Sequence, residues 1–288
     1  MAAAEIDPAL LPTEQDVRFY EQHGWWISPP IVPDDLIDDA RFGADRYYAG
    51  EKDEFLLFEA GTDWSPSHGD VLRQNDYVSL QIDQLRQLVK HELIAHAAAI
   101  LARTDQIRLF HDQLIYKPPR VDPFASTVGW HTDIAYWKTC SSRNLITAWI
   151  PFQPVTMDMG PMTVLDRSHR WTGNEHLEFF HDPDLLGIER RIDKNSDRLD
   201  EMPLLLDAGQ VSFHHCCTIH GSKPNHSGRP RLALAVHMQD RDNHYRAAEH
   251  NGKPVTHLND FLCRRDAAGN PDYADPDICP VLWEARQS

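Results

Sequence analysis

Two segments far apart in the sequence end in side chains that can bind a metal, and this feature restricts the possible folds most strongly. The first contains His131-Thr132-Asp133, and the second ends at His220. Two imidazoles and one carboxylate can occupy one face of a divalent iron and leave three positions open, which is the ligand set of non-haem Fe(II) oxygenases. The segments can share a metal only in a fold that brings them together, and the chemistry that such a site favours is oxidative.

Both segments have the composition of strand ends. Residues 130–137 predict the end of a half-buried strand, whose alternation would point His131 and Asp133 to the same face. The other interpretation of this triplet is a surface histidine and aspartate beside a turn. His220 closes a second strand-like segment, residues 209–222, and rigid scaffolds commonly present functional side chains at such ends.

A lone cation follows in an apolar strand. Arg231 begins the strand-like segment 231–237, where a buried guanidinium needs a carboxylate partner and can bind one in bidentate geometry. If no acidic side chain lies opposite, the partner can be the distal carboxylate of a dicarboxylic co-substrate. Arg229 lies in the turn between Gly228 and Pro230, and we expect it to be a solvated charge.

These residues belong to a longer series of motifs. The series comprises residues 110–119, 129–133, 144–151, Gly160-Pro161 with Ser168-His169, and His220-Gly221-Ser222 with Asn225, Ser227 and Arg231. In order and spacing it resembles the phytanoyl-CoA dioxygenase family of Fe(II)/2-oxoglutarate oxygenases. Residues 13–24 resemble the opening helix and first strand of that family, so that the resemblance extends from residue 13 to about residue 240.

The resemblance implies a role for each matching residue. His131, Asp133 and His220 would be the catalytic iron ligands, and Arg231 would bind the far carboxylate of 2-oxoglutarate with assistance from Ser222. Two further residues, Gln113 and Trp149, would line the co-substrate pocket. The chain departs from the family at residues 165–169, where relatives often have Pro-Gly before Ser-His, and this puts the conformation of that loop in doubt.

The predicted fold is mainly β with flanking α-helices. Short strands and Gly- and Pro-containing turns between residues 107 and 240 predict an antiparallel double-sheet barrel, and the resemblance makes it a double-stranded β-helix, the cupin-like jelly roll. Helices are expected from residue 33 to about 48 and from 82 to 101. Residues 50–80 and 170–203 are expected to be loops over the site.

Length and composition predict one catalytic domain, residues 13–288, after a disordered leader at residues 1–12. No signal peptide or membrane span is apparent, and five scattered cysteines indicate a reducing, cytoplasmic setting. The formal net charge of −16 argues against nucleic acid as a partner and weakly against a polyanionic substrate. We expect a neutral or cationic small-molecule substrate and a monomer or homodimer.

The predicted activity is that of a non-haem dioxygenase dependent on Fe(II), 2-oxoglutarate and O2. It would hydroxylate a C–H bond of a small metabolite and release succinate and CO2. Two alternatives are a non-catalytic cupin-like module that binds a small molecule or metal, and a metal-dependent hydrolase. Arg231 argues against both, since neither needs a carboxylate clamp. A structural zinc site at residues 214–217 is disfavoured, because zinc ligands are normally separated by loops.

Overall fold

Two antiparallel sheets form the centre of the molecule in a computed structural model, which describes residues 7–56, 66–119, 126–192, 199–250 and 252–286. The larger sheet has the order β1(Trp25–Ile27), β8(Ser212–His215), β5(Ile146–Pro151), β10(Arg231–Asp240), β3(Gln106–Lys117), β13(Val281–Glu284), and β2(Arg73–Asp76) also pairs with β3. The smaller sheet has the order β4(Val128–His131), β9(His220–Ser222), β6(Met162–Leu165), β7(Glu201–Pro203). A separate hairpin is formed by β11(Ala248–His250) and β12(Lys253–Val255).

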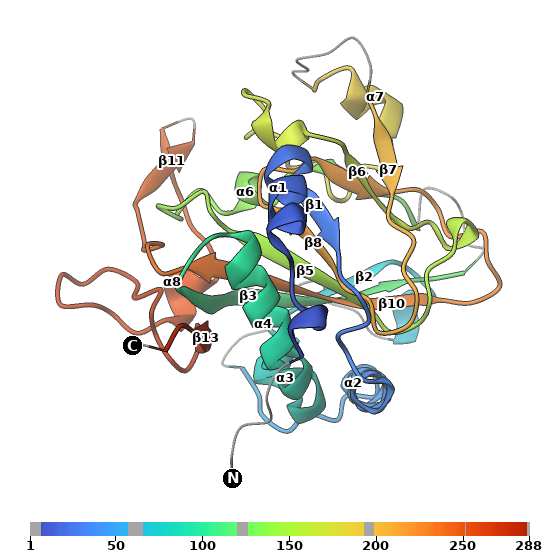
Figure 1. The fold of residues 1–288 in the computed structure, drawn as a ribbon, viewed down its shortest axis with the longest axis horizontal. Helices are drawn as coiled ribbons and strands as arrows, with labels where there is room; N and C mark the ends of the chain where they lie inside the picture. Colours follow the sequence, from blue (N-terminus) through green and yellow to red (C-terminus); the bar gives the residue numbers. More distant parts are fainter. Residues whose placement is uncertain (1–6, 57–65, 120–125, 193–198, 251, 287–288) are drawn as a thin grey trace.

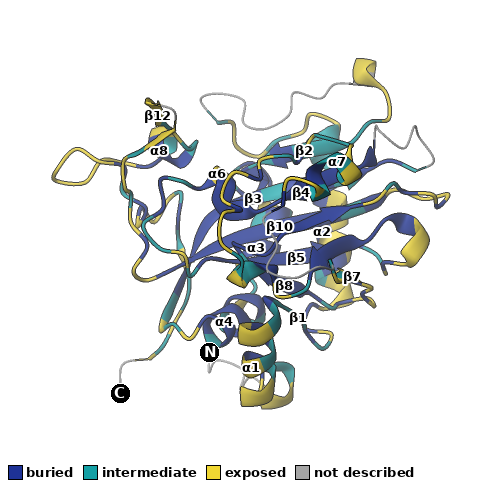
Figure 2. Cartoon of the chain, turned by 90° about the horizontal axis from the view of Figure 1, so that it is seen from above, coloured by how far each residue is buried: buried dark blue, intermediate teal, exposed yellow. Residues whose placement is uncertain are grey.

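The two faces of the larger sheet have different partners because side chains alternate along each strand. On β10, Leu234 and Val236 belong to the apolar cluster beneath the helices, whereas Ala233 and Ala235 pack in a second cluster with Val164 of the smaller sheet. In Figure 2, β3, β5, β8 and β10 are buried strands, with α1 and α4 on one side of them and β4 on the other. The inner face of β10 therefore carries small side chains between the two sheets.

Four helices cover the outer face of the larger sheet (Figure 1). They are α1(Glu14–His23), α2(Asp34–Tyr48), α3(Asp83–Val89) and α4(Glu92–Leu101). The predicted helix from residue 33 to about 48 is confirmed as α2. The single helix expected from 82 to 101 is wrong, because the chain turns at His91, whose extended backbone (φ −65°, ψ 116°) separates α3 from α4. The turn allows both helices to bury apolar side chains, such as Leu85 and Ile94, in one cluster.

The two segments that were expected to be loops contain regular secondary structure. Within residues 50–80, which were expected to be irregular, β2 pairs with β3, and Trp64 lies outside the described residues. Within residues 170–203, α7(Leu185–Glu189) precedes β7. The remaining short helices are α6(Asp133–Tyr136) and α8(Asn259–Leu262), with single 3-10 turns at residues 66–68, 78–80, 157–159 and 168–170.

The start of the chain carries a short ordered element. Residues 1–6 of the expected leader lie outside the described residues, whereas Pro8–Leu10 form a 3-10 turn capped by Asp7, and Leu10 packs against the apolar cluster under the helices. Across the described residues, no helix is both long and apolar enough to cross a bilayer.

Candidate active site

Neighbouring strands of the smaller sheet bring the three predicted iron ligands together. β4 ends at His131 and β9 begins at His220, and these two residues are paired in the sheet register. Asp133 does not continue the strand, as the sequence suggested, but is the first residue of α6. Thr132 between them keeps an extended backbone (φ −119°, ψ 143°), so the alternation that points residues 131 and 133 to the same side still holds. The three ligand atoms lie within 4.8 Å of one another, and all three side chains are buried.

Backbone carbonyls set the orientation of both imidazoles. His131 Nδ1 lies 2.8 Å from the carbonyl oxygen of Gly129, and His220 Nδ1 lies 3.0 Å from that of Thr218. A carbonyl can only accept, so each Nδ1 is the protonated nitrogen and each Nε2 keeps its lone pair. Burial lowers the pKa of both histidines, which favours the neutral form that binds metals.

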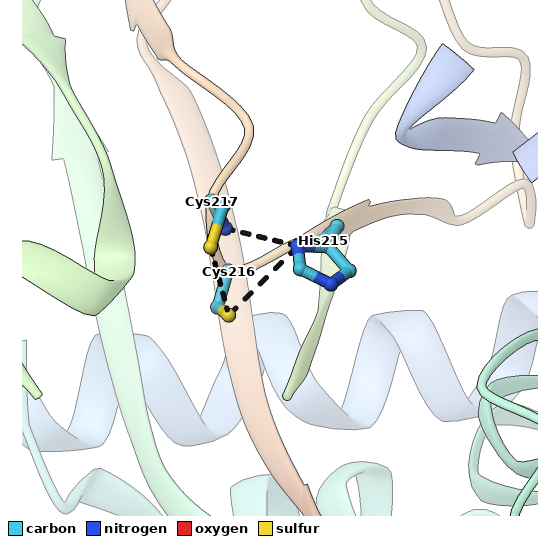
Figure 3. Close-up of side chains that lie close together, drawn as sticks. All are labelled: His215, Cys216 and Cys217. Carbon is cyan, nitrogen blue, oxygen red and sulfur yellow. Dashed lines mark hydrogen bonds between the residues drawn. The ribbon is translucent and has the colours of Figure 1, made fainter. Parts of the chain in front are cut away.

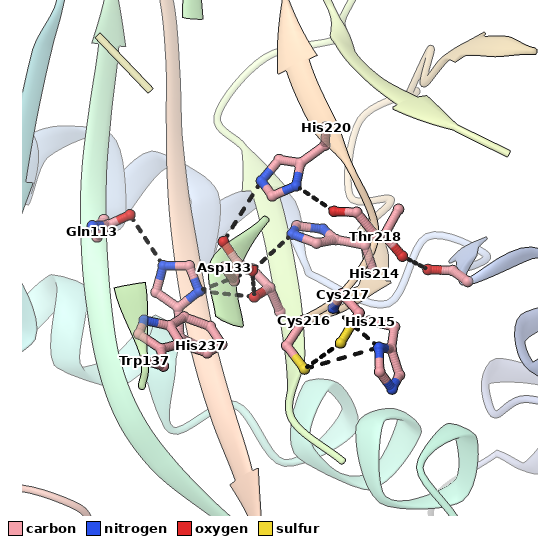
Figure 4. A network of polar contacts seen from close by, with 12 residues as sticks. Gln113, Asp133, Trp137, His214, His215, Cys216, Cys217, Thr218, His220 and His237 are labelled. Atoms are coloured by element: carbon pink, nitrogen blue, oxygen red, sulfur yellow. Dashed lines mark hydrogen bonds and ion pairs between the residues drawn. The ribbon is translucent and has the colours of Figure 1, made fainter. Parts of the chain in front are cut away.

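The carboxylate of Asp133 is held by one of its two oxygens (Figure 4). Oδ2 accepts a hydrogen bond of 2.7 Å from the Thr147 hydroxyl and one of 3.2 Å from His214 Nε2. Oδ1 lies 3.7 Å from His220 Nε2, on the side of the other two ligands. Burial alone would raise the pKa of Asp133, but the charge interaction with His220 and the hydrogen bond from His214 hold it well below its usual value. The triad thus offers two neutral imidazoles and one ionised carboxylate.

A cavity of about 440 Å³, including its mouth, connects the triad with Arg231. The Arg231 guanidinium is buried, donates from Nη1 to the carbonyl oxygen of Gly160, and has no hydrogen-bond partner for Nε. Within the described part of the chain, no acidic side chain pairs with it, and burial lowers the pKa of Arg231 to about 9. A buried guanidinium without a carboxylate is costly, and an anionic ligand in this cavity would remove that cost.

The other two predicted pocket residues lie on opposite sides of the cavity. Trp149 lies under Arg231, with 5.2 Å between its ring centroid and the guanidinium carbon. Gln113 lines the cavity near the triad, where its Oε1 lies 3.1 Å from His237 Nε2 and its Nε2 donates to Asp76 Oδ1 over 2.7 Å. Gln113 therefore separates this cavity from the next one and does not contact Arg231.

Lys117 is a buried basic residue beside Arg231. It pairs with Arg231 in the β3–β10 register, and its Nζ donates to Ser222 Oγ over 2.6 Å and to the carbonyl oxygen of Lys223 over 2.6 Å. Burial and the charge of Arg231 lower the pKa of Lys117 well below its usual value. Ser222, expected to assist Arg231, thus bonds to Lys117. The signal in the sequence was a second cation at the end of an apolar strand.

A second cavity, of about 900 Å³ with its open side, lies on the other side of the triad. It shares His131, Asp133 and Gln113 with the first cavity. Aromatic and imidazole side chains form most of its wall, together with residues from β2 and from the segment before α8: Gln74, Asp76, Tyr77, His111, Tyr136, Trp137, Phe180, His181, His237, Thr256, His257 and Leu258. The triad can therefore be reached from two separate spaces.

Close packing at Gly129 keeps residues 177–182 over this region. A β-carbon at Gly129 would lie only 1.9 Å from the carbonyl oxygen of Phe179 and 2.4 Å from that of Asp182. Because glycine permits this approach, Phe180 reaches both cavities, and its ring centroid lies 5.1 Å from that of His131. The expectation that the segment 170–203 covers the site holds for its residue 180.

The group His215, Cys216 and Cys217 also places three ligand-type atoms within 4.8 Å (Figure 3). Its donors are already engaged. His215 Nδ1 accepts a hydrogen bond from the backbone N–H of Cys217 over 3.1 Å, Cys216 donates to the carbonyl oxygen of Arg143, and the Arg143 guanidinium lies 3.1 Å from Cys217 Sγ. A cation beside one sulfur and an occupied imidazole lone pair do not suit zinc, which agrees with the sequence expectation.

The loop in which the chain departs from the family pattern has an unusual backbone. Arg167 adopts the left-handed conformation (φ 63°, ψ 6°), and its N–H donates to the carbonyl oxygen of His23 over 3.0 Å. This position corresponds to the glycine that relatives often have before Ser-His, and glycine takes such angles without a steric penalty. Arg167 therefore holds this conformation at the expense of local strain.

Comparison with known proteins identifies the family of the chain. The model of the phytanoyl-CoA dioxygenase family matches residues 20–233. The peroxisomal phytanoyl-CoA dioxygenase of Mus musculus is 26% identical over 255 residues, which cover 82% of this chain and 71% of that protein.

Two solved structures share the fold. The carbocyclase SnoK from nogalamycin biosynthesis, described as non-haem and α-ketoglutarate dependent, has a TM-score of 0.68 at 21% identity and covers 94% of this chain and 96% of its own. EctD from S. alaskensis, solved with 2-oxoglutarate and 5-hydroxyectoine, has a TM-score of 0.68 at 18% identity. The match covers 96% of this chain and 95% of the EctD chain. The expected double-stranded β-helix core with flanking helices is confirmed. By its motifs, fold and family match, the chain belongs to the phytanoyl-CoA dioxygenase family of Fe(II)- and 2-oxoglutarate-dependent oxygenases.

Proposed function

We propose that His131, Asp133 and His220 bind Fe(II) and that Arg231 binds the distal carboxylate of 2-oxoglutarate, in an enzyme that hydroxylates a C–H bond of a small metabolite. The observation that carries this proposal is that the guanidinium of Arg231 is buried without an acidic partner among the described residues. It lies in the cavity that also contains the triad. A dicarboxylate could bind the metal at the triad with one end and form an ion pair with Arg231 at the other. Lys117 lies at the same end, where its Nζ donates a hydrogen bond to the Ser222 hydroxyl.

The residues of the chain position the reactants and exclude water. When bound, the iron supplies the oxidation of the substrate by O2, coupled to conversion of 2-oxoglutarate into succinate and CO2. Trp149 and the small side chain of Ala235 shape an apolar wall along the co-substrate cavity. In such a dry site, the interaction of Arg231 with a carboxylate is stronger than it would be in water.

The substrate would enter from the second cavity. Relatives include a 1-deoxypentalenic acid 11-β-hydroxylase from Streptomyces exfoliatus, 22% identical over 254 residues, and EctD was solved with the hydroxylated compound 5-hydroxyectoine. Hydroxylation of a small molecule is the outcome that we propose here too, and the net charge of −16 favours a neutral or cationic one. Five buried, free cysteines agree with a reducing cytoplasm. We also propose a single domain over residues 13–288, as a monomer or homodimer.

A non-catalytic binding module is the alternative. It would share the cupin-like sheets but would have no use for a cavity that joins a metal triad to an unpaired arginine. Succinate formation separates the two, because only the oxygenase consumes 2-oxoglutarate.

The first experiment is anaerobic titration of the protein with Fe(II) and 2-oxoglutarate, followed by visible absorbance. We expect a charge-transfer band in the wild type, no band in His131→Ala, and a band in Arg231→Ala that needs at least tenfold more 2-oxoglutarate, about the effect of losing one charge-assisted contact. Arg229→Ala is the matched control, since Arg229 is exposed in the turn before β10. A wild type that binds iron and 2-oxoglutarate without a band would overturn the proposal.

A further inference from the structure

The second cavity differs from the co-substrate cavity in charge. The co-substrate cavity contains Arg231, whereas no lysine or arginine is among the described residues that line the second cavity. Its wall contains two carboxylates, Asp133 and Asp76. Asp133 belongs to the metal triad, so Asp76 is the acidic group that remains for another ligand.

The pairing of β2 with β3 places Asp76 in the cavity. Asp76 lies opposite Gln113 in the register, and Gln74 lies opposite Ile115. Residues 74 and 76 share one face of β2, and both line the cavity. β2 pairs with β3 off the main path of the sheet, so it brings an additional wall to the mouth of the barrel.

Among the described residues, one hydrogen-bond donor reaches the carboxylate of Asp76. Oδ1 accepts from Gln113 Nε2 over 2.7 Å, and no described cation forms an ion pair with the carboxylate. Burial raises the pKa of Asp76 to about 6. The hydrogen bond from Gln113 lowers this pKa, whereas the nearby charge of Asp112 raises it further. The group is therefore mostly ionised at neutral pH, and a partly buried carboxylate of this kind is stabilised by a cationic partner.

A second side chain of the cavity also lacks a partner. Trp137 Nε1 donates to His111 Nε2 over 3.1 Å, and an indole can only donate, so the proton of this histidine lies on Nδ1. His111 is 5% exposed, and its Nδ1 has no hydrogen-bond partner. Burial lowers the pKa of His111 well below its usual value, so it is a neutral donor. Because this nitrogen is itself enclosed, His111 supports the wall, and Asp76 is the anionic acceptor that the cavity offers.

We propose that the second cavity binds a small molecule with a positively charged amine and that Asp76 pairs with its nitrogen. The aromatic side chains of Tyr136, Trp137 and Phe180 would contact its carbon skeleton. A coenzyme A thioester carries several phosphate charges, for which the described wall has no cation. This inference rests on the proposed function and names its substrate class.

Affinity selection with mass spectrometry tests this proposal without knowledge of the substrate. The full chain, loaded with Mn(II) and 2-oxoglutarate in place of the reactive iron complex, is incubated with an equimolar mixture of primary amines, their N-acetyl derivatives and the matching carboxylic acids, all below 300 Da. We expect the wild type to retain amines above both other classes. The selection is repeated with metal-free protein, so that a failure of the iron proposal does not remove the test of Asp76.

Three variants complete the test. Asp76→Asn can still accept the hydrogen bond from Gln113 but lacks the charge, and we expect it to bind the retained amines about 10- to 100-fold more weakly, the effect of losing a charge-assisted hydrogen bond. Asp76→Glu should recover part of the affinity, and Asp242→Asn, at an exposed position, should not change it. Retention of acids over amines, no retention of amines by the wild type, or equal retention by Asp76→Asn would each overturn the proposal.

Discussion

The Thr147 hydroxyl lies 2.7 Å from Asp133 Oδ2 and donates a hydrogen bond to it. Thr147 comes from β5 of the larger sheet, whereas Asp133 follows β4 of the smaller one. The hydrogen bond holds Asp133 Oδ2 against the larger sheet, so that the other oxygen, Oδ1, lies on the side of His220. The orientation of the acidic ligand therefore depends on a side chain that does not itself belong to the triad.

Replacement of Thr147 by valine tests this dependence. We expect Thr147→Val to weaken Fe(II) binding about 10-fold or more, because outer hydrogen-bond partners of metal ligands typically contribute 10- to 100-fold in affinity. Thr147→Ser keeps the hydroxyl and should bind iron like the wild type. Anaerobic competition with a chromogenic chelator measures both constants, and equal affinity of the two variants would contradict the assigned role.

The width of the co-substrate cavity can be tested at Ala235. This residue lines the cavity between Trp149 and Gln113, its neighbours in the register on either side. A leucine would project into the space near Arg231, and we expect Ala235→Leu to lower the affinity for 2-oxoglutarate at least 100-fold, while Fe(II) binding stays within about threefold. Ala235→Ser, which adds only one atom, is the control. Calorimetric titration of the Mn(II)-loaded protein would show unchanged affinity in Ala235→Leu if the co-substrate bound elsewhere.

The strained loop at Arg167 yields a stability prediction. A non-glycine residue in the left-handed region costs on the order of 1 kcal/mol, so Arg167→Gly should raise the free energy of unfolding by about 0.5–1 kcal/mol. Arg167→Ala removes the same side chain but keeps the strain, and it should not be stabilised. Urea denaturation of the two variants separates the backbone effect from the loss of the ion pair with Asp166. Equal stability of the glycine and alanine variants would refute the strain.

Features that depend on local sequence pattern could be predicted, whereas features that depend on contacts between distant residues could not. The helix at residues 34–48 and the strands of the core follow from periodicity, and the meeting of His131 with His220 follows from motif order. The break at His91 was not predictable, because both of its flanks have helical spacing and only tertiary packing selects the turn. The position of Asp76 in the second cavity depends on the pairing of β2 with β3 across more than thirty intervening residues, and local pattern contains no information on that register.

Buried imidazoles predict a loss of stability in acid. Burial lowers the pKa of His237 to about 4, from an ordinary value of 6.5. Between pH 6.5 and 4, the unfolded state therefore binds a proton at this residue that the folded state does not, and the free energy of unfolding falls as the pH falls. The loss reaches on the order of 3 kcal/mol for a shift of this size.

The measurement is the stability of the metal-free protein by urea denaturation at pH 6.5, 5.5 and 4.5. His237→Gln cannot titrate and retains amide groups that can bond to Thr147 and Gln113, the partners of the imidazole. The free energy of unfolding of this variant should fall less steeply with decreasing pH than that of the wild type. Near pH 5, the difference between the two slopes should correspond to the uptake of about one proton on unfolding. Identical slopes would show that His237 titrates normally in the folded protein.

The attachment of β2 to one neighbour has an evolutionary consequence. His131, His220, Arg231 and Trp149 lie on strands of the two sheets, and Asp133 follows shortly after β4, so that mutations there affect both the oxidative chemistry and the packing of the core. Gln74 and Asp76 lie on β2, which pairs with β3 and with no other strand in the described part of the chain. New substrates can therefore be acquired by point changes in this short strand, while the reaction centre is inherited intact.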